Sequence, residues 1–207
     1  MLLHTTLPNE CFCITYQSPL GEIELQSNGK ELTGLWFSDQ QQKPTFHINT
    51  QPIWPTKGQK ELLPVFEETV CWLDKYFDGK EPDCLPPLSL TGTDFSKEVW
   101  TLLMHIPYGQ VISYKQLAHT IDCRHGKSGM SAQAIGRAVG RNPISIVIPC
   151  HRVVGSNGSL TGYAGGIERK RWLLEREGIE CNKLNKIASK DMLFHGERTS
   201  FEYEKQQ

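Results

Sequence analysis

The 207-residue sequence has no hydrophobic run long enough to span a membrane, and its first residues form neither a basic leader nor a long apolar stretch. We therefore expect an intracellular, cytoplasmic protein. Compositional bias is also absent, since hydrophobic residues make up 38% of the chain and charged residues 22%. This excludes a disordered, collagen-like or coiled-coil protein, and the length fits one domain with additions or two small domains.

The number of cysteines is odd, so they cannot all be paired in disulfides. The seven cysteines stand at positions 11, 13, 71, 84, 123, 150 and 181. A chain of this length does not need disulfides to fold, so we expect reduced thiols, and the odd count leaves at least one free.

The net charge of -1 shows no excess of one sign, but the charges are unevenly distributed. Residues 1–96 carry a net charge of -7, residues 97–180 a net charge of +5, and residues 181–207 a net charge of +1. A polyanion-binding second part would give this asymmetry, and so would solvated basic helices.

The first third of the chain predicts an antiparallel meander. Apolar residues alternate over 12–16, 23–25 and 35–37, and turn sequences stand at 19–21 and 28–29. Residues 39–58 resemble a surface loop. A helical period then runs over 62–77, with Pro64 tolerable in its first turn, and 81–92 is the best candidate for a linker.

Beyond the linker the pattern predicts short helices. Thr93 or Asp94 can cap a helix that ends before 107–109, and residues 113–116 have the spacing of a capping box for a second helix. A polar loop over 122–130 leads to a third helix, 131–140. The pair forms a possible helix-turn-helix, although its loop is long for that motif.

The third helix has small residues where a surface helix usually has long ones. Ala132, Ala134, Gly136 and Ala138 leave much of its surface nearly bare. Helix packing and approach to a narrow groove both explain this, and the nearby Arg137 and Arg141 favour a phosphate-lined partner.

Cys150 is the candidate nucleophile. A short buried strand predicted over 144–148 ends at Pro149, which places Cys150 where the chain leaves the core. His151 is the candidate base, because only a deprotonated sulfur attacks well. Neighbouring side chains on an extended backbone point apart, so a water or a bend after Pro149 must connect the two.

The last predicted helix, 167–177, offers an acceptor for His151. Glu177 follows Leu173 and Leu174 at helical spacing and precedes Gly178, which ends the helix. Two readings remain open, a buried carboxylate with a partner and a partly exposed residue at the helix end.

These motifs resemble the methylated-DNA–protein-cysteine methyltransferases, also called O6-alkylguanine-DNA alkyltransferases. The resemblance runs over about 84 residues, and the sequences that carry it are YGQVISY at 108–114, RNP at 141–143, IPCHRV at 148–153, TGYAGG at 161–166 and residues 170–178. Ser18-Pro19-Leu20-Gly21 also resembles the family.

The resemblance implies an α/β plus α fold. A small ribonuclease-H-like N-terminal α/β domain with antiparallel strands would occupy 1–90. A mainly helical domain for DNA binding and alkyl transfer, containing the helix-turn-helix, would occupy 91–180, and a charged tail would follow over 181–207.

The implied reaction is direct DNA repair that consumes the protein and needs no cofactor. Cys150 would take the alkyl group from O6 of guanine, or from O4 of thymine, and keep it. Glu177, His151 and a water relay would deprotonate Cys150, with Asn142 supporting the loop around it. The Tyr114 hydroxyl would donate towards N3 of the departing guanine.

The resemblance also implies that a monomer binds double-stranded DNA through the minor groove and flips the damaged base. The residues at the family's base-pocket positions are Val139, Val153, Tyr163, Ala164 and Gly165. The expected DNA contacts are Ala132, Gln133, Ala134, Gly136, Arg137, Arg141 and Arg152. Gln133 departs from the arginine that many members insert into the duplex, which predicts weaker base extrusion here.

Some members bind structural zinc in the N-terminal domain, but Cys11 and Cys13 do not match that site, so we predict no metal. Two other functions share some of these features. A damage sensor or DNA-binding regulator would share the helices and the charge but transfer nothing. A cysteine hydrolase using Cys150, His151 and Glu177 would turn over.

Overall fold

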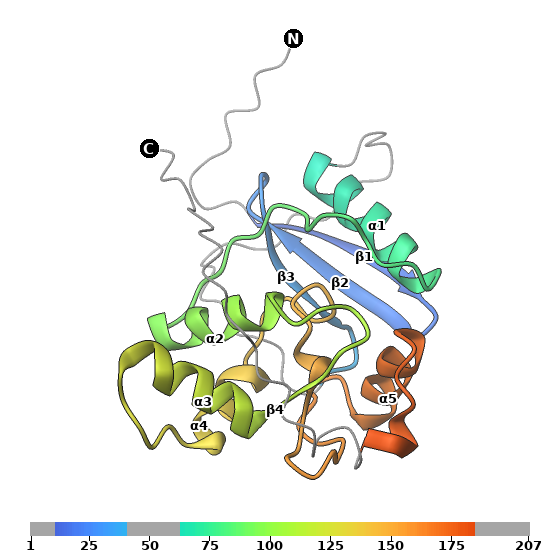
Figure 1. Cartoon of the computed structure of the whole chain (residues 1–207). Helices are drawn as coiled ribbons and strands as arrows, with labels where there is room; N and C mark the ends of the chain where they lie inside the picture. Colours follow the sequence, from blue (N-terminus) through green and yellow to red (C-terminus); the bar gives the residue numbers. More distant parts are fainter. Residues whose placement is uncertain (1–10, 41–62, 185–207) are drawn as a thin grey trace.

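The computed structural model describes residues 11–40 and 63–184 (Figure 1). Its first element is an antiparallel sheet in the order β1-β2-β3, built from Phe12–Ser18, Gly21–Ser27 and Leu32–Phe37. The β1–β2 turn is tight because Gly21 has φ +108°, which disfavours a side chain. The predicted meander is confirmed. Most of the predicted loop 39–58 lies outside the described residues.

Helix α1, Pro64–Phe77, packs against the sheet (Figure 1). Pro64 stands at the start of the helix, where its missing N–H costs no hydrogen bond, as the sequence predicted. The buried side of α1 carries Phe66, Leu73 and Tyr76, and Tyr76 is one of the largest fully buried side chains of the described chain.

The outer edge of β3 is hydrogen-bonded to two later segments. In the linker, Pro87 O accepts from Leu32 N, and Ser89 N donates to Leu32 O. In the segment before Cys150, Pro143 O accepts from Leu35 N, and Ser145 N donates to Leu35 O. The linker and the segment before Cys150 therefore both continue the sheet as single bridges.

The strand predicted over 144–148 is wrong. Only Ile144 bridges to β3, and the chain then turns, with Ile148 N donating to Ile144 O at 3.0 Å. Ile146 adopts φ +69°, a left-handed conformation that is strained for a β-branched residue. A short apolar run bounded by prolines is buried equally well as a turn, so its hydrophobicity did not define its backbone.

The helical half contains α2 (Asp94–Met104), α3 (Tyr114–His125) and α4 (Ala132–Gly140), each capped by the side chain of the residue before it. The predicted capping box is present, since Ser113 and Gln116 bond reciprocally. Two-residue strands β4 (Ile112–Ser113) and β5 (Val153–Val154) pair in parallel. Helix α5 (Ile167–Arg176) follows, and residues 181–183 form a 3-10 turn.

In Figure 1, α2, α3 and α4 gather on one side below the sheet, and α5 lies on the other side. One hydrophobic core runs through both halves, including Leu25 and Phe37 from the sheet and Leu103 and Ile135 from the helices. The predicted fold, an antiparallel sheet domain followed by a mainly helical domain, is confirmed. Within the described ranges, no helix has the length and apolar character needed to cross a membrane. The predicted tail lies outside the described residues from position 185 onwards.

Candidate active site

Cys150 begins a 3-10 turn, Cys150–Arg152, directly after Pro149. The turn is closed by Arg152 N, which donates to Pro149 O at 3.0 Å. Of the two links that the sequence left open, a water or a bend after Pro149, the bend is present, and both side chains lie inside the protein. Cys150 keeps 5% of its surface exposed and His151 none.

Asn142 holds the turn that precedes Cys150. Its Nδ2 donates to Ile148 O at 2.8 Å and to Ile144 O at 3.3 Å, and its Oδ1 accepts from Ile144 N at 3.1 Å. Since all of these groups are buried, losing the amide would leave backbone groups without partners. The structure thus places Asn142 where it was expected, at the support of the loop around Cys150.

His151 and Glu177 form a buried pair. Nε2 of His151 lies 2.7 Å from Oε1 of Glu177, and the carboxylate, which directly follows α5, is only 6% exposed. Of the two readings left open for Glu177, the buried one is confirmed. Because a carboxylate only accepts, Nε2 carries the hydrogen and Nδ1 is the basic nitrogen. Nδ1 is buried and has no hydrogen-bond partner among the described residues.

Glu177 accepts hydrogen bonds from three further groups that the sequence did not indicate. Tyr76 Oη donates to Oε1 at 2.8 Å, Gly109 N donates to Oε2 at 3.1 Å, and Arg152 donates to both oxygens at 3.0 and 2.8 Å. Burial alone would raise the pKa of Glu177, but His151 and Arg152 lower it to about 2. The carboxylate is therefore ionised at neutral pH.

Arg152 was expected to contact DNA, and this expectation needs correction. Its side chain is buried, with Nε and Nη2 on Glu177 and Nη1 donating to Ile106 O at 2.6 Å. The buried carboxylate needs a cationic partner, and Arg152 fills that role from the turn that carries His151. Its guanidinium is not available to a phosphate on the surface.

The Cys150 thiol is protonated in the resting protein. Burial raises its pKa, while Asn142 and Lys170 act in the opposite direction. Burial also lowers the pKa of His151, and this outweighs the opposing effect of Glu177. A neutral thiol beside a neutral imidazole is the starting point for general-base activation, in which the imidazole takes the thiol proton.

The residues expected to form the base pocket differ in burial. Val139, Val153 and Tyr163 are buried, whereas Ala164 is exposed. Gly165 lies against Phe37 of β3, so closely that a Cβ at this position would meet the ring at 2.9 Å. This contact joins the pocket segment to the sheet.

Tyr114 begins α3 with its hydroxyl towards residues 161–162. It donates to Thr161 O at 3.2 Å and Gly162 O at 3.3 Å. Burial raises its pKa to about 12, with a further contribution from Cys150, so the phenol is neutral and able to donate. Lys170, which the sequence did not single out as a site residue, donates from Nζ to the same Thr161 O at 2.6 Å.

Helix α4 presents Ala132, Gln133 and Arg137 to solvent, with Arg141 directly after it. Ala134 and Gly136 are half-buried. A Cβ at Gly136 would meet only Tyr114, at an ordinary 3.9 Å, so packing within the protein does not require glycine there. Ala138 is instead buried, and its carbonyl accepts from Trp100 Nε1 at 2.9 Å. The bare surface is thus smaller than expected.

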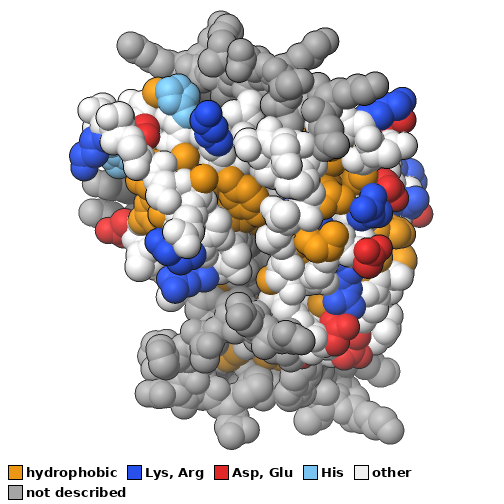
Figure 2. Space-filling view, turned by 90° about the horizontal axis from the view of Figure 1, so that it is seen from below, with side chains coloured by type: hydrophobic (Ala, Val, Ile, Leu, Met, Phe, Trp, Pro, Cys, Tyr) orange, Lys and Arg blue, Asp and Glu red, His pale blue; other side chains and the backbone are white. Residues whose placement is uncertain are grey.

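The charge around α4 has one sign. No Asp or Glu occurs between Asp122 and Glu168, while the exposed Lys and Arg residues of this stretch stand at 124, 127, 137 and 141. Figure 2 views the molecule from the side on which α3, α4 and α5 lie, and it shows Lys and Arg side chains beside apolar and uncharged surface, with Asp and Glu side chains mainly towards the right of the view. Such a surface suits a polyanion.

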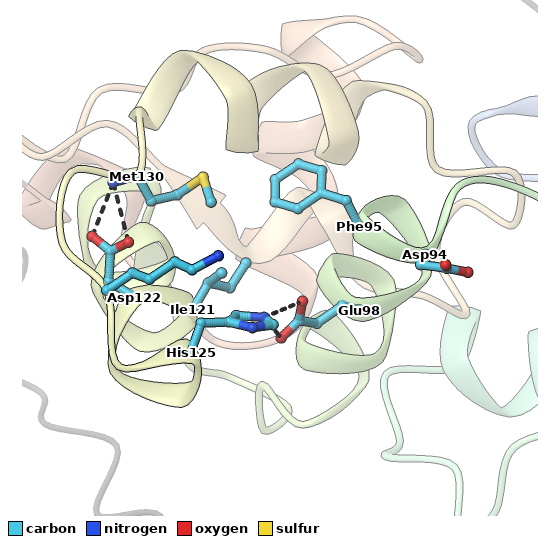
Figure 3. A pocket seen from close by; sticks show the side chains of 8 residues that line it. Asp94, Phe95, Glu98, Ile121, Asp122, His125 and Met130 are labelled. Atoms are coloured by element: carbon cyan, nitrogen blue, oxygen red, sulfur yellow. Dashed lines mark hydrogen bonds and ion pairs between the residues drawn. The ribbon is translucent and has the colours of Figure 1, made fainter.

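A hollow of about 310 Å³ lies between α2 and α3, apart from Cys150 (Figure 3). Glu98 pairs with His125 at 2.9 Å across it. Asp122 accepts from Gly129 N and Met130 N, both at 2.9 Å, and so orders the long loop between α3 and α4. None of the expected site residues lines this hollow.

A buried cysteine beside a hydrogen-bonded His–Glu pair indicates a protein of the class that uses a cysteine thiol as nucleophile, and the basic residues around α4 indicate a polyanionic partner. Family models match both halves. Residues 11–90 match the ribonuclease-like domain of 6-O-methylguanine DNA methyltransferase, and residues 94–179 match its DNA binding domain. The chain therefore belongs to the methylated-DNA–protein-cysteine methyltransferase family and is an enzyme of that family.

Individual proteins agree with this. The chain is 42% identical over 164 residues to the methylated-DNA–protein-cysteine methyltransferase of Mycobacterium bovis, covering 79% of this chain and 90% of that protein. It is 38% identical over 166 residues to the Haemophilus influenzae protein of the same name, covering 79% and 84%. The structure of Mycobacterium tuberculosis OGT in complex with DNA matches with a TM-score of 0.69 and 38% identity, over 84% of this chain and 98% of that one.

The predicted absence of metal concerns the N-terminal half. Cys11 and Cys13 are both buried, with their sulfur atoms 4.0 Å apart. Within 11–40 and 63–184, no group of three His, Cys, Asp or Glu side chains is placed to hold a metal ion.

Proposed function

We propose that this protein repairs DNA by transferring an alkyl group from O6 of guanine to Cys150. The single observation that carries this proposal is the buried Cys150 followed by His151, whose Nε2 is fixed by Glu177 at 2.7 Å while Nδ1 has no partner among the described residues. That arrangement supplies a nucleophile and a base on one turn. Membership of the family supports an alkylated guanine in DNA as the substrate.

The proton leaves the thiol before the bond forms. It passes from Cys150 Sγ through a water to His151 Nδ1, and Glu177 stabilises the resulting imidazolium through Nε2. The thiolate then attacks the alkyl carbon. A carbon–sulfur bond forms as the carbon–O6 bond breaks, and the electron pair of that bond moves into the guanine.

The departing guanine carries the negative charge until it is protonated. Tyr114 Oη, which donates to Thr161 and Gly162 in the free protein, would turn its hydrogen bond to N3 of the purine. His151 then gives its proton to the guanine, which leaves as a neutral molecule. The products are an unmodified guanine and an S-alkyl cysteine, so each molecule reacts once.

The nearly buried sulfur requires the base to leave the duplex. We infer that α3 and α4 act as a helix-turn-helix in the minor groove, with Gln133 near the gap left by the base and Arg137 and Arg141 on phosphates. The basic, small-residue surface of α4 supports this. DNA binding itself is supported by the match of residues 94–179 to a DNA binding domain and by the DNA complex of the Mycobacterium tuberculosis relative.

The test is incubation of the protein with duplex DNA labelled on the methyl group of O6-methylguanine, followed by mass spectrometry of the Cys150 peptide. We expect one equivalent of label on Cys150 and none on Cys150→Ser, which should still bind the DNA. Absence of label would indicate a sensor, and continued release of product would indicate a hydrolase.

Two finer parts of the proposal, the choice of lesion and the oligomeric state, need further measurements. Repeating it with O4-methylthymine shows whether that lesion is also a substrate. Sedimentation of the free protein and of the complex tests the expectation that one monomer acts on each lesion.

A further inference from the structure

Tyr76 belongs to α1, in the half of the chain that precedes the linker, yet its hydroxyl reaches the His151–Glu177 pair. Oη donates to Glu177 Oε1 at 2.8 Å and lies 3.4 Å from His151 Nε2. The side chain is fully buried. A buried phenol needs a partner for its O–H, and here that partner is the carboxylate that orients the proposed base.

The ring of Tyr76 is held independently of its hydroxyl. It stacks on Trp72 with 5.4 Å between ring centroids and meets Phe77 and Tyr108 edge-on at 5.6 and 6.1 Å. These contacts need only the ring, so a phenylalanine can occupy the same place. The hydroxyl can therefore be removed without removing the packing.

We propose that Tyr76 is a positioning residue for the alkyl transfer, whose hydroxyl holds the Glu177 carboxylate so that Oε1 accepts the Nε2–H of His151 and Nδ1 stays free to take the thiol proton. The inference rests on the proposed function of the Cys150 site. It gives the N-terminal half a direct connection to the reacting groups.

The physical effect follows from how Oε1 is shared. This oxygen accepts from Tyr76, from His151 and from Arg152 Nη2. Each donor draws on the same negative charge, so a carboxylate with one donor fewer is a stronger acceptor for the imidazolium. Removing the hydroxyl therefore raises the pKa of His151 and makes less neutral base available at a given acidic pH.

Several other groups face His151, and Tyr76→Phe changes none of them. Helix α5 and the residue after it supply Lys170 and Glu177, the turn supplies Cys150 and Arg152, and the pocket segment supplies Tyr163, whose ring centroid lies 6.4 Å away. A change in the His151 titration is then assignable to the hydroxyl.

The test compares the protein with Tyr76→Phe. We expect the acidic limb of the transfer rate to move to higher pH by about 0.7 units, so that the rate below this limb falls about fivefold. Nitrogen-15 shifts of the labelled histidines give a second readout that needs no substrate. They should show the same shift for the titration of His151.

The opposite change tests the sign. Site-specific replacement of Tyr76 by 3-fluorotyrosine makes the phenol a stronger donor, and the limb should then move to lower pH. Tyr16→Phe is the matched control, because Tyr16 is also a tyrosine of the N-terminal half that donates to a carboxylate, Asp74, at 2.7 Å, but away from the site. It should leave the rate and the His151 titration unchanged.

A lower melting temperature of Tyr76→Phe with an unmoved limb and an unmoved His151 titration would overturn the proposal, since the hydroxyl would then serve stability alone. Equal shifts for both tyrosine variants would overturn it too. If the protein transferred no alkyl group but Tyr76→Phe shifted the imidazole titration, the proposed function would fail while the coupling of Tyr76 to His151 stood.

Discussion

The two halves of the chain differ in how they contribute to the site. The C-terminal half supplies the groups that would react, Cys150, His151, Glu177 and Tyr114. The N-terminal half supplies contacts that hold them: Tyr76 on Glu177, Phe37 against Gly165, and Asp39 on Arg169. The sheet domain therefore supports the site. Mutations of supporting residues should mainly lower stability, whereas mutations of the site residues should mainly lower the transfer rate.

The largest effect is expected where both roles meet, at Glu177. Glu177→Gln leaves the buried Arg152 without its carboxylate, which should lower the free energy of unfolding by about 3 kcal/mol. The transfer rate should fall about 100-fold, because the imidazolium loses its stabilising charge. Denaturant unfolding and single-turnover kinetics measure the two effects. Glu175→Gln, on the exposed side of α5, is the control, and equal losses in both variants would contradict the assignment.

The pH dependence of stability should identify the same carboxylate. The pKa of Glu177 is lowered from 4.5 to about 2 in the folded protein. Its stabilising contribution is therefore complete above about pH 4.5 and is lost as the pH falls towards 2, by about 3 kcal/mol in total. As the pH falls through this window, the free energy of unfolding should decrease more steeply for the natural sequence than for Glu177→Gln. Parallel curves would show that another group carries the effect.

A smaller effect should come from the support alone. Arg169 pairs with both oxygens of Asp39, donates to Leu20 O at 3.0 Å and to Gly165 O at 3.2 Å, and lies over the Phe37 ring at 4.1 Å. Arg169→Gln should cost about 1 kcal/mol of stability, since Asp39 is largely exposed. Transfer should slow without a shift of its acidic limb. Arg171→Gln, exposed on the same helix, should change neither.

The smallest effect is expected on α4, at the surface proposed to bind DNA. Gln133→Arg should raise the transfer rate on duplex DNA about threefold, because a guanidinium stacks in the gap better than an amide. The rate on a free O6-alkylguanine base should not change. Unaltered flipping and repair of duplex DNA would remove the proposed role of Gln133.

The sequence predicted those parts of the fold that local patterns determine. The alternation of Phe12, Ile14 and Tyr16, the Ser113–Gln116 capping box and Thr93 each appear as expected. The 144–148 turn was missed because its left-handed Ile146 is stabilised by Asn142 and by β3, which are contacts from outside the run.

The candidate reactive residues could be named from the sequence, but their partners could not. Cys150, His151 and Glu177 belong to sequences that resemble a family, whereas Tyr76 appeared only as one more aromatic residue in a helical pattern. A large phenol next to the apolar stripe of 66, 70, 73 and 77 is the one signal that pointed to it, since a buried hydroxyl requires a partner. Arg152 was placed on DNA because an arginine after Cys-His gives no sign that it is buried.

The hydrogen bonds on the outer edge of β3 also bear on how the protein behaves outside its reaction. An unpaired edge strand invites pairing with other chains, and here Pro87, Ser89, Pro143 and Ser145 occupy the donors and acceptors that would do so. The segment leading to Cys150 thus shields this edge of the sheet from pairing with another chain. A mutation that detaches residues 143–145 from β3 would expose the unpaired edge strand, so distortion of the Cys150 site and aggregation should begin together.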